Sequence, residues 1–109
     1  MPGPHAPSTT IVQTREFLAW LAGLRDQRAR ARILMRIDRL NLGHFGDTKS
    51  VGGEVSELRV DYGPGYRLYF ARRGKHLILL AYGGDKSRQK TDIARAREIV
   101  AAWESEYGD

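Results

Sequence analysis

The spacing of hydrophobic residues changes along this chain from a helical period to an alternating one, and the change predicts its elements. Residues 9–13 form a short β-branched segment that is typical of a strand. After it, apolar residues recur at three and four positions, the period of a helix packed on a core. The residues with this spacing are Phe17, Trp20, Leu21 and Leu24. Thr14 precedes them and has a side chain suited to cap the helix.

A second helix is expected from Asp26, another good N-cap residue, to about Leu42 and Gly43. Its predicted core stripe consists of Ala29, Ile33, Ile37 and Leu40. A basic stripe runs beside it and contains Arg25, Arg28, Arg32, Arg36 and Arg39. This stripe is either an electrostatic footprint for RNA or an acidic protein, or a solvated face whose arginine stems cover apolar surface. We favour the second interpretation.

An alternating pattern begins after residues 43–53, which we interpret as a glycine-rich loop holding Lys49. Leu58 and Val60 alternate with polar neighbours, and so do the apolar residues of segment 66–71. The turn-forming sequence of residues 61–65 between them predicts an antiparallel hairpin. A third strand, residues 76–82, is apolar at nearly every position and is therefore expected to be buried on both faces.

The last predicted element is a helix that follows a glycine-marked basic turn at residues 83–86. Ser87 is a reasonable cap for this helix. Its apolar residues, spaced by three and four, are Ile93, Ala96, Val100, Trp103 and Tyr107. We therefore predict an α+β fold, in which an N-terminal strand and a three-strand meander form a small, mainly antiparallel sheet. Two N-terminal helices and a C-terminal helix pack against that sheet.

The parity of the hairpin gives the sharpest inference about its side chains. If the apolar residues of both strands share the core face, Arg59 and Arg67 must share the opposite face. A turn centred on Gly63 places the two arginines directly across from each other, because each is equally far from it in the sequence. Like charges at such positions destabilise a sheet. Compensation is expected from Glu57 on the same face, from a carboxylate elsewhere, or from a bound anion.

Composition narrows the classes of function. The chain has 109 residues, enough for one small domain, which we place at residues 9–109 after a disordered leader at residues 1–8. It has no cysteine and only 3 scattered histidines, so neither a disulfide nor a metal site is expected. No apolar run approaches the roughly 20 residues that span a bilayer, and the N-terminus is unlike a secretory signal. We expect a cytoplasmic protein without a membrane partner.

The net charge of +5 favours partners rich in phosphate or carboxylate. Two paired arginines can bind phosphate oxygens through bidentate hydrogen bonds, and Lys86 at the end of the third strand can add a third cation or donate a proton. Such a group would hold the scissile phosphate of RNA and stabilise its transition state. The alternative is a solvated sheet face paired to acidic neighbours. Candidate bases without specific support are His44, His76, Lys49, Asp85, Lys86 and Asp92.

The order of elements resembles the RelE/ParE toxin superfamily over roughly residues 9–107. Two stretches, GHFGDTKSVGGEVSELRVDYGPGYRLYF and LLAYGGDKSRQKTDIARAREI, resemble its HigB-like "addiction module killer protein" branch more closely. The combination of ELR, GPGYRLYF and GGDKS in this order is typical of that branch. The resemblance implies the toxin of a bacterial type II toxin–antitoxin pair, neutralised by a cognate antitoxin that is usually a small helix-turn-helix protein. Operator DNA would be bound only through that antitoxin.

The resemblance also implies an activity: endonucleolytic cleavage of mRNA, commonly on the ribosome, without metal or other cofactor. Arg67 matches the catalytic arginine that follows Gly-Tyr in RelE-type toxins, and Arg59 matches a basic position on the preceding strand. Lys86 lies near the basic residue that follows the last strand in that family. Further RNA-binding positions are expected at Lys49, Arg88 and Lys90. The catalytic tyrosine of RelE-type toxins has no counterpart, because residues 91–93 read Thr-Asp-Ile.

Two other functions are compatible with the same resemblance. ParE relatives share the fold but inhibit DNA gyrase, so fold alone does not decide between a nuclease and a binding toxin. A degenerate toxin, kept as a scaffold or as a repressor partner of the antitoxin, is the third hypothesis.

Overall fold

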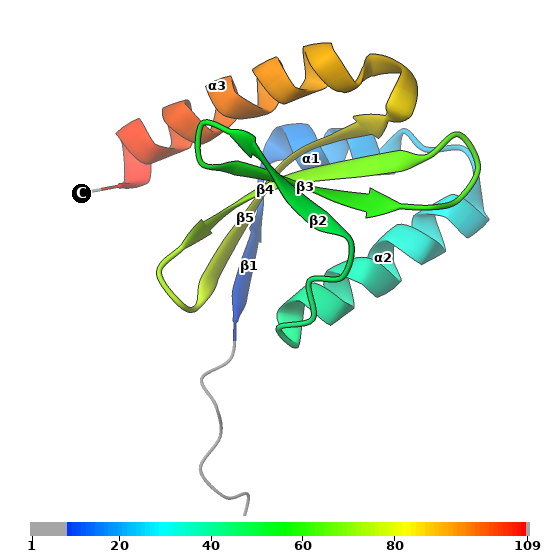
Figure 1. Cartoon of the computed structure of the whole chain (residues 1–109), viewed down its shortest axis with the longest axis horizontal. Coiled ribbons are helices and arrows are strands. Elements are labelled where there is room, and N and C mark those ends of the chain that lie inside the picture. Colours follow the sequence, from blue (N-terminus) through cyan, green and yellow to red (C-terminus); the bar gives the residue numbers. More distant parts are fainter. Residues whose placement is uncertain (1–8, 109) are drawn as a thin grey trace, which may run out of the picture.

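The computed structural model describes residues 9–108, so the predicted leader at residues 1–8 lies outside the described residues. Figure 1 shows a central sheet between two helical layers. The strands are β1 (Thr10–Gln13), β2 (Thr48–Gly52), β3 (Val55–Val60), β4 (Tyr66–Arg73) and β5 (Leu77–Asp85). The helices are α1 (Arg15–Ala22), α2 (Gln27–Asn41), the 3-10 turn η1 (Lys86–Arg88) and α3 (Gln89–Tyr107).

The sheet has five strands in the order β1-β5-β4-β3-β2. The pairs from β2 to β5 are antiparallel, and β1 pairs with β5 in parallel. The expected α+β class is therefore confirmed, and the arrangement is consistent with the RelE-like fold. Among the described residues, no helix is both long and apolar enough to cross a membrane.

One strand was missed by the sequence pattern. Residues Thr48–Gly52, expected to belong to a loop, form β2 at the edge of the sheet beside β3. Most of its residues are exposed, so no buried face requires apolar residues at alternate positions. The sequence of β2 therefore shows no alternating pattern. Lys49 therefore belongs to a strand and lies directly opposite Glu57 in the register.

The two helical layers cover opposite faces of the sheet (Figure 1). On one face, α1 and α2 pack over a core cluster that includes Phe17, Ile33, Leu58 and Leu68, all with no exposed surface. On the other face, α3 packs over a second cluster formed by residues such as Tyr69 and Ala96. The face opposite the first core therefore carries apolar residues as well as the paired arginines, and α3 covers part of it.

Two predicted caps fix the entry into the first helices. The Thr14 hydroxyl accepts a hydrogen bond from the Phe17 backbone N–H at 3.0 Å and donates one to the Ala81 carbonyl at 2.6 Å. The cap thereby also joins α1 to β5. The Asp26 carboxylate accepts from the backbone N–H groups of Arg28 and Ala29, at 3.0 and 3.2 Å. Both caps were expected from the sequence and are confirmed.

The end of β5 differs from the prediction. The strand continues through Gly83 and Gly84 to Asp85, although these glycines indicated a turn. A Cβ on Gly83 would lie 2.2 Å from the Trp20 ring, and one on Gly84 would lie 1.9 Å from Asp92 Oδ2. Both glycines are therefore required because a helix approaches each face of the strand closely, and not because the chain reverses there.

The cap expected at Ser87 is also corrected. Asp85 accepts hydrogen bonds from the Ser87 backbone N–H at 2.9 Å and from the Ser87 hydroxyl at 2.5 Å. This arrangement forms η1, and α3 begins only at Gln89, with Arg88 as an N-cap that makes no side-chain hydrogen bond. Asp85, the last residue of β5, therefore caps the turn through its carboxylate, and Ser87 serves as its hydrogen-bond donor.

Candidate functional site

The two arginines of the hairpin lie directly opposite each other. Arg59 on β3 pairs with Arg67 on β4, between the pairs Leu58–Leu68 and Val60–Tyr66. The expected register is therefore confirmed. Leu58, Val60, Tyr66 and Leu68 all belong to the core beneath α1 and α2, so the arginines point to the α3 side.

Glu57 supplies the compensation that this like-charge pair requires. Its Oε2 lies 3.6 Å from Arg59 Nε and 3.6 Å from Arg67 Nε, and its side chain has no exposed surface. Its Oε1 accepts a hydrogen bond of 2.5 Å from the amide of Gln89, in the first turn of α3. The carboxylate on the same face, one of three expected sources of compensation, thus neutralises part of the pair.

The two arginines differ in their access to solvent. The Arg59 side chain is 38% exposed and has a second carboxylate, Asp47, at 3.7 Å. The Arg67 side chain is only 11% exposed, and its Nη1 donates to the Tyr66 carbonyl at 3.4 Å. An incoming anion would therefore meet Arg59 at the rim of the site and Arg67 at its base.

Lys86 is brought to the same end of the hairpin. Its backbone N–H donates to the Gly65 carbonyl at 2.7 Å. A Cβ on Gly65 would lie 3.6 Å from Lys86 Cβ and 3.7 Å from Arg67 Nη1, so the Arg67 guanidinium and the first carbon of the Lys86 side chain both lie close to Gly65. Arg67 itself pairs with Gly84 on β5. Arg59, Arg67 and Lys86, which are distant in sequence, therefore form one basic group.

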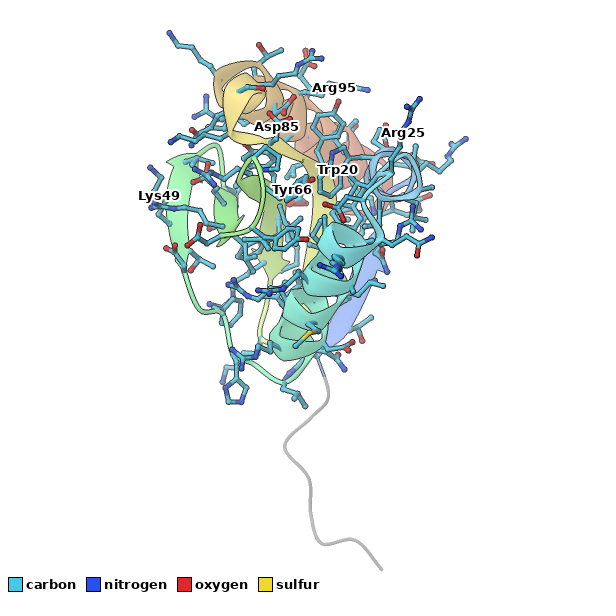
Figure 2. The ribbon with its side chains drawn as sticks, turned by 90° about the vertical axis from the view of Figure 1, so that its right-hand side faces the viewer. Trp20, Arg25, Lys49, Tyr66, Asp85 and Arg95 are labelled. Carbon is cyan, nitrogen blue, oxygen red and sulfur yellow. The ribbon has the colours of Figure 1, made fainter. Side chains whose placement is uncertain are left out.

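The other predicted RNA-binding residues surround this group. A shallow open depression beside the start of α3 is lined by Lys86, Ser87, Gln89, Lys90 and Ile93. Gln89 connects it to the arginine pair through its hydrogen bond to Glu57. Lys49 lies on the neighbouring edge strand, labelled at the left of Figure 2, and Arg88 is exposed just before α3.

The basic stripe on α2 is divided between structural and exposed residues. Arg36 is partly buried, and its Nη1 donates to the Arg59 carbonyl at 2.8 Å; burial, and secondly the nearby Arg39, lower its pKa. The Arg32 guanidinium lies 5.0 Å from the centre of the Tyr62 ring. These contacts support the favoured structural interpretation for Arg32 and Arg36. Arg32 is nevertheless exposed, as are the other members, Arg25, Arg28 and Arg39.

Neither histidine among the candidate bases lies next to the arginine pair, whereas Lys86 belongs to the basic group and the Asp92 carboxylate lies against Gly84, the residue paired with Arg67. His76 lies in the turn after β4, at the opposite end of that strand from Arg67. His44 is exposed in the loop between α2 and β2, and Asp85 caps η1. Asp92, in the first turn of α3, is only 5% exposed, and burial raises the pKa of its carboxyl despite the opposing effect of Arg88.

The structure adds two site residues that the sequence did not single out, Gln89 and Tyr69. Tyr69 lies opposite Glu57 and is fully buried; burial first, then Glu57 and Asp92, raise the pKa of its hydroxyl well above the usual range. Tyr69 could have been found from the sequence, because it lies two residues after Arg67 on the same strand and must therefore share its face. No pattern indicated which α3 residue would reach Glu57. Among the described residues, no three His, Asp or Glu side chains are grouped to hold a metal ion.

Comparison with known proteins supplies the family. Residues 19–102 match the family described as "Phage derived protein Gp49-like (DUF891)". This chain belongs to the Gp49-like family. A Haemophilus influenzae protein, described only as "Uncharacterized protein", is 47% identical over 90 residues, which cover 83% of this chain and 91% of that protein. The Gp49-like family is a RelE/HigB-type toxin family, so the predicted toxin identity is supported, and membership implies an antitoxin partner.

Proposed function

We propose that this Gp49-like toxin belongs to the HigB-like branch of a bacterial type II toxin–antitoxin system and cleaves mRNA in the cytoplasm. The observation that carries the proposal is the convergence of Arg59 and Arg67 with Lys86 at one end of the hairpin. Three cations within one small group suit a phosphodiester that gains negative charge in its transition state. The proposed cleavage needs no metal or other cofactor.

Each residue has a distinct proposed role. Arg59 and Arg67 bind the non-bridging oxygens of the scissile phosphate while the 2′-oxygen attacks phosphorus and its proton passes to water. Lys86 protonates the departing 5′-oxygen, and the other product ends in a 2′,3′-cyclic phosphate. Lys49, Arg88 and Lys90 bind neighbouring phosphates through charge. Because neither candidate histidine lies next to the arginine pair, stabilisation of the developing charge supplies most of the proposed rate enhancement.

The proposed partners follow from this role. A cognate antitoxin, a small helix-turn-helix protein, neutralises the toxin, and operator DNA is bound only through it. The mRNA is presented on the ribosome, whose own phosphates suit a chain with a net charge of +5.

A second candidate function is inhibition of DNA gyrase by docking, without chemistry. The low exposure of Arg67, 11%, and the buried position of Asp92 favour this alternative, since a binding toxin needs neither an open phosphate site nor a base. The two functions differ in what is damaged first, mRNA or DNA.

The test is expression of wild type and an Arg67→Gln variant without antitoxin, with mRNA decay and the DNA-damage response followed together. We expect wild type to cleave mRNA rapidly and Arg67→Gln to lose at least about 100-fold in rate, the typical effect of removing one transition-state donor. The matched control is Arg15→Gln, the same substitution at an exposed residue of α1. Antitoxin binding reports that each variant is folded.

Two results would count against the ribonuclease proposal. One is full mRNA cleavage by the Arg67→Gln variant. The other is a DNA-damage response with intact mRNA in cells expressing wild type, which would favour gyrase inhibition. Growth without any inhibition, when no antitoxin is present, would indicate the degenerate toxin.

A further inference from the structure

Glu57 is a buried charge that the proposed chemistry does not use. It has no exposed surface, and among the described residues the only other polar or charged side chains that are buried are Thr14 and Asp92. Thr14 is accounted for as the cap of α1. Burying a carboxylate is costly, and an apolar residue of similar size is often as good for stability. The burial of Glu57 therefore indicates a role beyond holding the sheet together.

The geometry around Glu57 is symmetric with respect to the two arginines. Its Oε2 is 3.6 Å from the Nε atom of each, and these are contacts of opposite charges without a direct hydrogen bond. In both arginines the atom closest to the carboxylate is Nε, at the inner end of the guanidinium. Because a guanidinium is planar and rigid, the position of Nε strongly restricts the direction of the two terminal nitrogens.

Gln89 fixes the carboxylate from the other side. Its amide donates to Glu57 Oε1 at 2.5 Å, so the first turn of α3 determines where the carboxylate lies. The residue opposite Glu57 on β2 is the exposed Lys49, and the residue opposite it on β4 is the buried Tyr69. Glu57 is thus held between α3 and the sheet, with the charge of its Oε2 directed at the arginine pair.

We propose that Glu57 is a positioning residue, which holds Arg59 and Arg67 so that their terminal nitrogens present one joint binding edge to a phosphate. The proposal rests on the proposed ribonuclease function and specifies how its site is organised. Without Glu57, two adjacent guanidiniums repel each other and turn apart. With it, the pair carries a reduced net positive charge. The positive charge that remains stabilises the negative charge that develops in the transition state.

Glu57→Gln tests this proposal, because it keeps the size of the side chain and removes only its charge. The variant protein is more positive, so binding of a 2′-O-methyl RNA, which cannot be cleaved, is expected to be equal or tighter. Cleavage of the matching RNA in a single turnover is expected to fall by roughly 100-fold, as for a misplacement of catalytic groups by about 1 Å. A loss of stability alone would not separate binding from cleavage in this way.

Glu54→Gln is the matched control, because Glu54 is an exposed acid at the β2–β3 turn and the substitution changes the charge equally. It should leave the cleavage rate unchanged. Gln89→Ala removes the second support of the carboxylate but keeps both arginine contacts. We expect a smaller loss of cleavage, again without weaker RNA binding, and this variant replaces Glu57→Gln if the latter does not fold.

A second measurement separates this inference from the proposed function. NMR signals of the Nε–Hε groups report the order and solvent exchange of Arg59 and Arg67 directly. In the Glu57→Gln variant, or in Gln89→Ala if the former does not fold, both groups should exchange faster and become less ordered. Unchanged signals would overturn the positioning role. So would a Glu57→Gln variant that cleaves RNA as fast as the Glu54→Gln control. If wild type cleaves no RNA, the proposed function fails and the NMR comparison still decides the inference.

Discussion

Gly83→Ala is the sharpest test of how the α1 layer is packed on the sheet. Gly83 lies in β5 and is buried beneath the indole of Trp20. A methyl group at Gly83 would lie 2.2, 2.4 and 2.6 Å from three carbons of that ring. Carbon atoms in normal contact are about 3.5 Å apart, so the closest approach falls short by about 1.3 Å.

The ring has little freedom to absorb this shortfall. Its centroid is 5.7 Å from the centroid of the Phe17 ring and 6.3 Å from that of Tyr66, and Figure 2 shows Trp20 and Tyr66 side by side. Either the indole leaves its site or the whole of α1 shifts away from β5. Overpacking of this kind costs typically about 1–3 kcal/mol. We expect a loss near the upper end, about 3 kcal/mol, because the atoms in conflict are a rigid ring and a strand backbone.

The assay is urea unfolding of four proteins: wild type, Gly83→Ala, Trp20→Ala and the double variant. Without the indole the added methyl group meets no ring, so Gly83→Ala should cost less than about 1 kcal/mol in that background. The expected coupling energy is therefore about 2 kcal/mol, within the range found for residues in direct contact. Additive effects, or a Gly83→Ala variant as stable as wild type, would refute this account of the glycine.

Two further predictions concern buried polar groups, Asp92 in the first turn of α3 and Tyr69 on β4 beneath that helix. Burial raises the pKa of Asp92, so the folded protein holds this proton more tightly than the unfolded chain does. Wild-type stability should fall as pH rises from the ordinary Asp pKa of 3.8 through the raised folded value, and then level off. Asp92→Asn should be more stable than wild type at neutral pH and should lose this advantage in acid; thermal unfolding at several pH values checks this, and a loss independent of pH contradicts it. Tyr69→Phe should leave stability unchanged or raise it by up to about 1 kcal/mol, because the hydroxyl is buried without a hydrogen-bond partner among the described residues. A clear loss of stability in urea unfolding would show that this hydroxyl does make a stabilising contact.

Much of the fold was predictable because local and nearly local rules decide it. Thr14 and Asp26 cap helices through atoms two or three residues away, so their identity is sufficient to place a helix start. The pairing of Arg59 with Arg67 follows from alternation and from one short turn. Both cases involve few residues and short separations along the chain, for which sequence carries the necessary information.

The failures arise where the environment of a residue depends on distant elements. Most side chains of the edge strand β2 are exposed, so its sequence lacks the alternation of apolar and polar residues that identifies a strand. Gly83 and Gly84 indicated a turn, whereas Trp20 and Asp92 require them within a strand. In each case the residue type is dictated by a neighbour that is far away in the sequence.

The sequence by itself determined the helices, the hairpin, the shared face of the two arginines and the basic character of the site. These features depend on period and parity, which a single strand or helix already contains. Only the tertiary structure decided that α3 lies over the arginine face, that Gln89 reaches Glu57, and that Lys86 joins the pair. The reason is physical. Glu57 is buried between two guanidiniums only because a second layer excludes water from that face of the sheet, and that layer is the last helix of the chain.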